Sequence, residues 1–175
     1  MKGLGFLLGQ ALRYALYTLV HVFIVSRLVL FDAGWCFFYL GFLLFLPLGT
    51  PVVAQLLLAF GVGLTMDIFY DTGGLHAAAA VLLAFVRPAV LRLLRPRDGY
   101  DAADAVNVNY MGPAWYLTYR GVLVLVHHLA FFLLELGSFR RFGLTLEKVG
   151  ASWVFTSAAL LMVQLLFFPV RRGRQ

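Results

Sequence analysis

The stretch that decides the fold covers residues 61–100 and reads GVGLTMDIFYDTGGLHAAAAVLLAFVRPAVLRLLRPRDGY. An apolar helix is predicted to run into Asp67 and Asp71. A turn through 72–74 then leads to a second apolar helix, which begins near His76. Two carboxylates and an imidazole are costly in an apolar environment, so this hairpin is where function should be sought first.

The composition indicates a membrane protein. Of the 175 residues, 62% are apolar and 13% are charged, whereas about half of a soluble domain is apolar. The net charge of +6 comes from basic residues at the ends of apolar runs. Such residues are typical of orientation signals and of contacts with anionic lipid, and they do not indicate nucleic acid. The single Cys36 excludes an internal disulfide.

Six apolar runs predict an all-α integral membrane protein, a six-transmembrane-helix bundle that forms one domain over 1–175. A full span needs about 20 helical residues, so the second run is the shortest candidate. It stops at Pro47, because proline cannot continue a helix. The predicted helices cover 7–26, 35–46, 52–68, 75–94, 115–136 and 151–168, and a solvated cytoplasmic loop with at most one helical turn covers 95–113.

The basic residues predict that both termini lie in the cytoplasm. Arg13 interrupts the first apolar run and no small-residue cleavage site follows, so we expect an uncleaved first helix. With six spans, more basic residues fall on the cytoplasmic side than outside. The two groups are Lys2, Arg92, Arg95, Arg97, Arg171, Arg172 and Arg174, against Arg27, Arg140, Arg141 and Lys148.

Asp67 and Asp71 are four residues apart, so we expect them on one helical face that continues the line of Ala59 and Gly63. Two interpretations remain open at this point. The aspartates either cap the outer helix ends and pair with His76 or a basic neighbour, or they form a cation or substrate site.

Other polar positions lie within the apolar runs. A stripe on the first helix is predicted to face the bundle interior or a partner helix, because facing lipid would be costly. His128 and Glu135 share a helical face, and without a third ligand they favour an interhelical hydrogen-bonding pair over a metal site. We therefore predict no catalytic, cofactor or metal site. The stripe consists of Gln10, Arg13, Tyr14, Tyr17 and His21.

A further pattern runs through the hairpin and beyond it. It consists of Gly63, Asp67, Phe69, Gly74, His76-Ala77, Ala84, Arg87-Pro88, Pro96 and Gly99-Tyr100, with His127-His128 and the segment 131–135 further along. This pattern, together with the total length, resembles the rod shape-determining protein MreD family, in the version typical of the Bacteroidota. The resemblance covers most of the chain.

The resemblance implies a non-enzymatic scaffold of the cell-elongation complex in the bacterial inner membrane. Such a protein binds MreC and works beside the actin-like MreB, a glycosyltransferase of the SEDS class and a class B transpeptidase. Its bundle is expected to be similar to the S-components of energy-coupling-factor transporters. A substrate-binding S-component-like subunit of a small-molecule transporter is therefore the alternative. The candidate partner-binding or bundle-stabilising residues are Asp67, Asp71, His76, Arg87, Pro88, Arg13, Tyr17, His21, His128 and Glu135.

Overall fold

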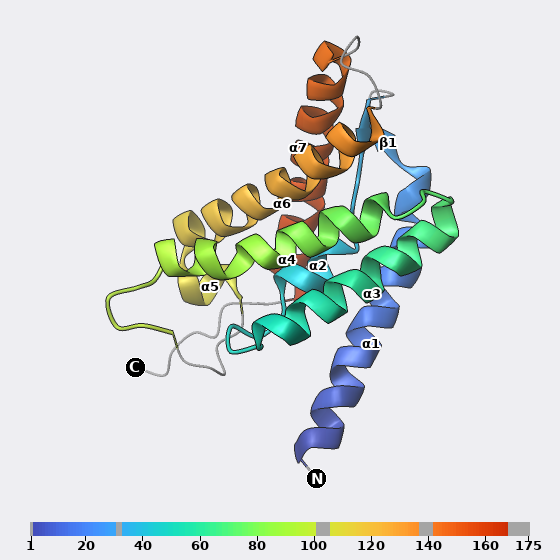
Figure 1. Ribbon diagram of the computed structural model, residues 1–175. Helices are drawn as coiled ribbons and strands as arrows, with labels where there is room; N and C mark the ends of the chain where they lie inside the picture. Colours follow the sequence, from blue (N-terminus) through green and yellow to red (C-terminus); the bar gives the residue numbers. More distant parts are fainter. Residues whose placement is uncertain (1, 31–32, 101–105, 137–141, 168–175) are drawn as a thin grey trace.

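The computed structural model describes residues 2–30, 33–100, 106–136 and 142–167, and this part of the chain is mostly helical (Figure 1). Five of its helices are long and apolar enough to cross a membrane, which is compatible with an all-α multi-pass membrane protein. The long helices are α1 (Lys2–Phe23), α3 (Val52–Tyr70), α4 (Leu75–Leu93), α6 (Pro113–Glu135) and α7 (Phe142–Phe167). The short elements are η1 (Val25–Arg27), β1 (Val29–Leu30), β2 (Gly34–Trp35), α2 (Leu40–Leu44) and α5 (Val108–Met111).

The predicted hairpin is formed by α3 and α4, which lie side by side (Figure 1). Asp71 ends α3 with φ of 53°, Gly73 follows with φ of 61°, and Gly74 precedes α4 with φ of 100°, so the turn uses three residues with positive φ. The helices approach closely at Gly63. A Cβ atom there would lie 2.3 Å from the Cα of Ala77, so only glycine permits this contact.

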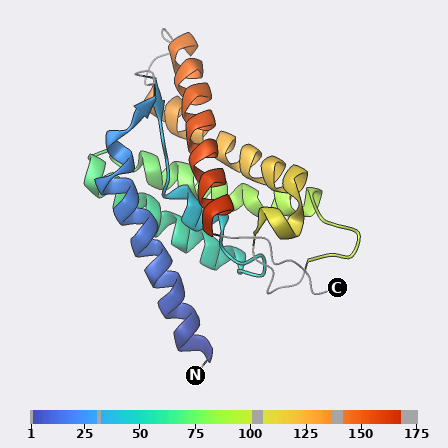
Figure 2. The ribbon, with the colours of Figure 1, turned by 180° about the vertical axis from the view of Figure 1, so that it is seen from behind.

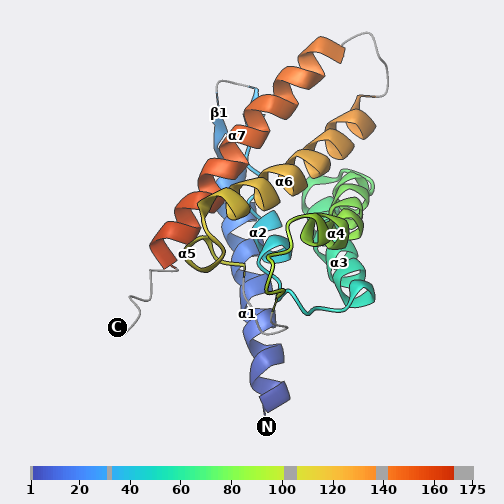
Figure 3. The same ribbon diagram turned by 90° about the vertical axis from the view of Figure 1, so that its left-hand side faces the viewer.

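The remaining helices pack outward from the hairpin. Helix α4 contacts α6, and α6 contacts α7 (Figure 3). Helix α1 packs against α2 and α3 on the other side of the bundle. The view from behind shows that α1 begins and α7 ends toward the same end of the bundle (Figure 2).

The prediction of one continuous helix over 35–46 is wrong. In its place the structure has strand β2, which pairs antiparallel with β1, and the five-residue helix α2. Among the described residues this leaves five long helices rather than six. The segment 36–46 is nevertheless buried almost throughout. Because its sequence is apolar on every side, its periodicity could not distinguish a membrane span from a core segment enclosed by protein.

This segment crosses the bundle in the direction opposite to α1 and α3. At one end the backbone N–H of Trp35 donates to Ser152 Oγ over 2.9 Å, and that of Phe37 donates to Thr156 Oγ1 over 2.9 Å. Both hydroxyls come from α7. Backbone without regular hydrogen bonds is tolerated at membrane depth only where protein encloses it. Ser152 and Thr156 of α7 therefore satisfy backbone N–H groups of this enclosed segment.

The other end of the segment is held in the same way by α4 and α6. Tyr119 donates its hydroxyl to the carbonyl of Leu44 over 3.0 Å, and Arg87 Nη2 donates to the carbonyl of Leu46 over 2.6 Å. Tyr119 is fully buried and Arg87 is 1% exposed. These two side chains provide donors for the carbonyl of the last residue of α2 and for one carbonyl just beyond it.

Three further boundaries differ from the prediction. The first helix covers Lys2–Phe23 rather than 7–26, and the 3-10 turn η1 follows it. Helix α7 begins at Phe142 rather than near 151, because its charged turn stays at the surface, where Lys148 Nζ lies 3.8 Å from Glu135 Oε2. The loop 95–113 contains the single expected turn, α5, but Val106 and Val108 are buried rather than solvated. Residues 101–105 of that loop lie outside the described residues. The helices near 52–68, 75–94 and 115–136 match within about two residues.

Replacing Thr156 with valine is expected to lower the free energy of unfolding by about 2 kcal/mol, because the buried N–H of Phe37 loses its acceptor. Titration with SDS of the protein in detergent micelles measures this change. Ser157→Ala is the matched control, since Ser157 Oγ is buried without a hydrogen-bond partner in the described structure. Equal destabilisation by both variants would contradict the assigned bond.

Candidate functional site

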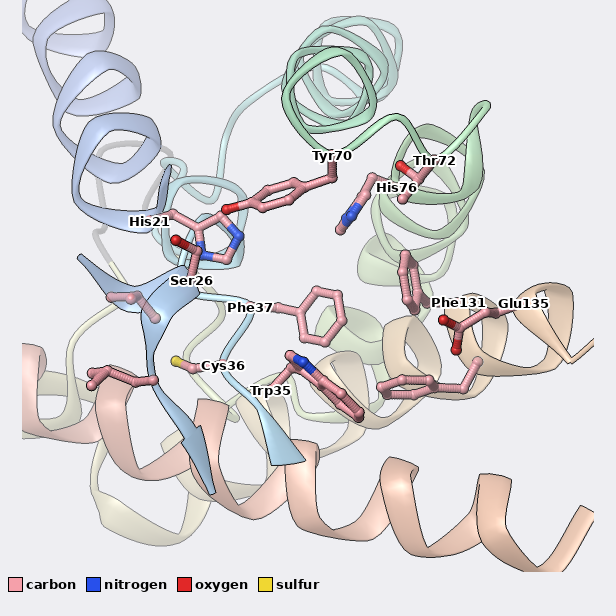
Figure 4. A pocket seen from close by; sticks show the side chains of 13 residues that line it. His21, Ser26, Trp35, Cys36, Phe37, Tyr70, Thr72, His76, Phe131 and Glu135 are labelled. Atoms are coloured by element: carbon pink, nitrogen blue, oxygen red, sulfur yellow. The ribbon is translucent and has the colours of Figure 1, made fainter. Parts of the chain in front are cut away.

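A cavity of about 280 Å³ lies near the turn between α3 and α4 (Figure 4). Its wall is largely aromatic, with Trp35 and Phe37 from the segment around β2, and Phe131 and Phe132 from α6. The polar side chains at its wall come from α1, η1, α3, the turn after α3, α4 and α6. They are His21, Ser26, Tyr70, Thr72, His76 and Glu135.

His21 has unused hydrogen-bonding capacity at this cavity. Its ring is 5% exposed and packs edge-on against Tyr39 and Tyr70, at centroid distances of 5.2 and 5.7 Å. Among the described residues its Nδ1 has no hydrogen-bond partner. Figure 4 shows the hydroxyl of Tyr70 pointing toward His21 and Ser26 across the top of the cavity. An unpaired imidazole nitrogen in a buried wall is costly unless a ligand or water satisfies it.

Behind this wall, Tyr39 joins two histidines. Its hydroxyl lies 3.0 Å from Nδ1 of His76 and 2.8 Å from Nε2 of His127. A hydroxyl donates one proton, so one imidazole accepts it and the other donates its own N–H to the same oxygen. Tyr39 and His127 are fully buried, and His76 is 5% exposed. The three groups therefore fix one another's tautomers and orientations.

His128 and Glu135 do not form the predicted pair. His128 Nδ1 lies 2.7 Å from the carbonyl of Val124, which it serves as donor, so its Nε2 accepts from Thr156 Oγ1 at 3.2 Å. Glu135 is exposed and pairs with Lys148 instead. Each residue thus contacts α7 and not the other. Helical spacing placed both on one face, but it could not show that each one meets a different turn of the neighbouring helix.

Asp67 caps the start of α4. Its Oδ1 accepts from the backbone N–H of His76 at 3.0 Å and from the hydroxyl of Thr72, and its Oδ2 accepts from the N–H of Ala77 at 3.0 Å. The first N–H groups of a helix have no acceptor within the helix, so a carboxylate there stabilises it. This agrees with the capping interpretation for Asp67.

Asp71 takes no part in this arrangement, and the prediction that the two aspartates share one helical face is wrong. Its left-handed backbone, with φ of 53°, takes it off the face that carries Asp67, and its side chain is exposed. The oxygens of Asp67 are already occupied by three donors. The two carboxylates therefore do not converge on a cation or substrate.

Arg87 lies deep in the bundle, away from the cavity. Its Nε donates to the hydroxyl of Tyr119 over 2.7 Å, in addition to the bond from Nη2 to Leu46, while Nη1 has no partner in the described structure. Pro88, the next residue, is half-buried inside α4 and lines a second cavity at the opposite end of the helix. Both residues serve the packing of α2, α4 and α6.

Only part of the polar stripe on α1 faces the bundle. Tyr17 is 8% exposed, and its ring fills the space next to Gly41, where a Cβ would lie 2.3 Å from Tyr17 Cε1. Tyr14 bonds through its hydroxyl to Thr65 Oγ1. Arg13, however, is exposed. Tyr14, Tyr17 and His21 therefore face the bundle interior, whereas Arg13 does not, and for Arg13 a partner helix stays a prediction.

Tyr39 is the functional residue that sequence reasoning missed. It lies in a run that was predicted to be a plain spanning helix, and nothing near it in the sequence points to His76 or His127. Its partners come from α4 and α6, so only the tertiary structure identifies it.

The lining of the cavity has the character of a small-molecule binding site. In the part of the chain that the structure describes, no three His, Cys, Asp or Glu side chains come together as metal ligands. The cavity offers flat aromatic walls and one unpaired imidazole nitrogen. It suits a small, flat and largely apolar molecule that makes one or two hydrogen bonds.

Comparison with known proteins found no relatives: no protein-family model, no curated protein and no solved structure matches this chain.

Proposed function

We propose that this protein is a non-enzymatic scaffold of the bacterial cell-elongation complex, which binds MreC and helps regulate peptidoglycan synthesis and cell shape. The proposal rests on the resemblance to the MreD family and on the exposed half of α1. Through MreC it would act indirectly with MreB, the SEDS glycosyltransferase and the class B transpeptidase. The membrane would be the inner membrane.

Three of the residues that carry the resemblance have structural roles in the bundle, which supports a similarity in fold. Gly63 sets the close approach of α3 and α4, Asp67 caps α4, and Arg87 holds the end of α2. A shared pattern of this kind suits a shared bundle and does not require a shared reaction. A bundle similar to the S-components is part of the same proposal.

The exposed polar part of α1 is the observation that carries the proposal. The first half of α1 extends away from the bundle (Figure 1), and Arg13 is exposed there although it lies within the stretch Leu7–Arg27, which could span the membrane. Polar residues at membrane depth usually face protein rather than lipid. A transmembrane helix of MreC that covers Arg13 would meet this need.

The orientation of the bundle is part of the proposal. The N-terminal end of α1 and the C-terminal end of α7 lie toward the same end of the bundle (Figure 2). The excess of basic residues expected there favours the cytoplasm for both termini. The cavity beside His21 would then open toward the outer face, where the exported part of a cell-wall complex works.

Replacing Arg13 with alanine is expected to lower the amount of MreC that copurifies by about fivefold, the effect of one lost polar contact between helices. The measurement is a mild detergent purification of the tagged chain from its native membrane, followed by quantitative mass spectrometry. Arg27→Ala is the matched control, because Arg27 is exposed just beyond the opposite end of α1. If wild-type protein brings down no MreC, the proposed function is wrong.

The alternative is a substrate-binding subunit of a small-molecule transporter. The specific observation in its favour is the cavity of about 280 Å³ with the unpaired Nδ1 of His21. It predicts a tightly bound small molecule and an ATPase module in the same purification. Their recovery in place of MreC would select this alternative, and the absence of both would exclude it.

A further inference from the structure

The second cavity, also of about 280 Å³, lies where α3 begins and α4 ends. Thr50 lies just before α3, and Gln55 lies in the first turn of α3. Arg92 is in the last turn of α4, and Arg95 lies just beyond it. This end of the bundle is opposite to the cavity beside His21, and none of the residues at that first cavity contributes to it.

The charge at this cavity is positive. Arg92 and Arg95 line it and are exposed, and neither has an ion-pair partner among the described residues. Within the part of the chain that the structure describes, no acidic side chain lines the cavity. The first turn of α3 adds backbone N–H groups without helical acceptors, together with the positive end of the helix dipole. These features together favour a phosphate group.

Tyr100 closes one side of this cavity as a neutral group. Its hydroxyl donates to the carbonyl of Leu91 over 3.0 Å and accepts from Trp115 Nε1 at 3.0 Å. Burial raises the pKa of Tyr100 above its ordinary value, so the hydroxyl stays protonated. The loop after α4 is thereby tied to α6, and Tyr100 itself adds no negative charge to the cavity.

Gln55 provides an acceptor with no partner. It is 3% exposed, and its Nε2 donates to the carbonyl of Thr50 over 2.6 Å. Its Oε1 is buried and has no hydrogen-bond partner in the described structure. Because an unpaired buried acceptor is costly, the site is suited to a ligand that carries a hydroxyl close to its phosphate.

The rest of the wall is apolar and continues onto the lipid-facing surface. Leu48, Val52, Pro88 and Leu91 line the cavity. Val52 is 45% exposed and the adjoining Val53 is 68% exposed, so an apolar path runs outward along α3. A free phosphate would leave this path unused, whereas an acyl chain would cover it.

We propose that this cavity binds the headgroup of an anionic glycerophospholipid. The phosphate lies between Arg92 and Arg95, a headgroup hydroxyl donates to Gln55 Oε1, and an acyl chain follows Val52 along α3. Basic pockets at the cytoplasmic ends of membrane helices bind anionic headgroups in this way. The site is independent of MreC and of the cavity beside His21.

The test uses the full-length chain, stripped of lipid in a neutral detergent, and follows its thermal unfolding midpoint as lipid is added. Phosphatidylglycerol is expected to stabilise it at lower concentration than phosphatidylmethanol, which has the same charge but no headgroup hydroxyl. Arg92→Ala combined with Arg95→Ala should weaken the phosphatidylglycerol response about 25-fold, or about fivefold for each arginine. Arg97→Ala is the matched control, because Arg97 is exposed in the same loop but does not line the cavity.

Three outcomes would overturn the proposal. The first is an unchanged response in the double variant. The second is an equal loss in Arg97→Ala, which would indicate diffuse charge rather than a site. The third is equal stabilisation by inorganic phosphate, which would indicate a soluble ligand. Gln55→Leu should remove the preference for phosphatidylglycerol over phosphatidylmethanol. If that variant does not fold, the comparison of the two lipids in wild-type protein tests the contact between the headgroup hydroxyl and Gln55 Oε1.

Discussion

Replacing Asp67 with alanine is expected to lower the free energy of unfolding by about 2–4 kcal/mol, since each buried polar group left without a partner costs about 1–3 kcal/mol. The carboxylate is the acceptor for the N–H groups of His76 and Ala77, and both lie inside the bundle. Titration of the purified protein with SDS, followed by circular dichroism, measures the loss.

Asp71→Ala is the control, because it removes the neighbouring carboxylate from an exposed side chain. Its effect should stay within about 0.5 kcal/mol. The comparison separates the two interpretations of the hairpin. If both variants are destabilised equally, or if both lose a bound cation, the acidic pair exists and the capping assignment is wrong.

Replacing Gly63 with alanine is expected to cost about 3 kcal/mol, at the upper end of what overpacking a core usually costs. The new Cβ would lie 2.3 Å from the Cα of Ala77 and 2.6 Å from its N, and a backbone cannot move aside as a flexible side chain can. Helices α3 and α4 would have to separate. The expected readout is a lower unfolding midpoint and a broader elution profile in size-exclusion chromatography.

Gly61→Ala provides the matched control on the same helix. A Cβ at position 61 meets nothing within 4 Å, so this variant should be as stable as wild type or slightly more stable, because alanine favours helix. A tolerated Gly63→Ala would show that α3 and α4 are further apart than described here.

The hairpin could be predicted from the sequence because its signals are local. Asp67 followed by Gly73 and Gly74 marks a turn and a cap, and long apolar runs on both sides mark helices. The same reasoning failed for the segment 35–46. A continuous apolar run carries no information about whether lipid or protein surrounds it, so a buried irregular segment and a short spanning helix look alike.

The candidate site was only partly predictable, for a related reason. His76 and His21 stood out as polar residues in apolar runs, and both line the cavity beside the turn. Their connection through Tyr39, and the pairing of His128 with Thr156, involve helices far apart in the sequence. Spacing along one helix indicates a face, but it does not indicate which side chain of another helix lies opposite.

The buried segment between α1 and α3 has a consequence for how the chain is made. Trp35 and Phe37 depend on hydroxyls of α7, and the carbonyls of Leu44 and Leu46 depend on α4 and α6. All of these partners are synthesised later than the segment itself. While the ribosome is still producing α3, the segment cannot lie in the hydrocarbon core, because its backbone groups would have no hydrogen-bond partners there. Its final insertion is therefore a late step of biosynthesis, and the last helix closes the bundle around it.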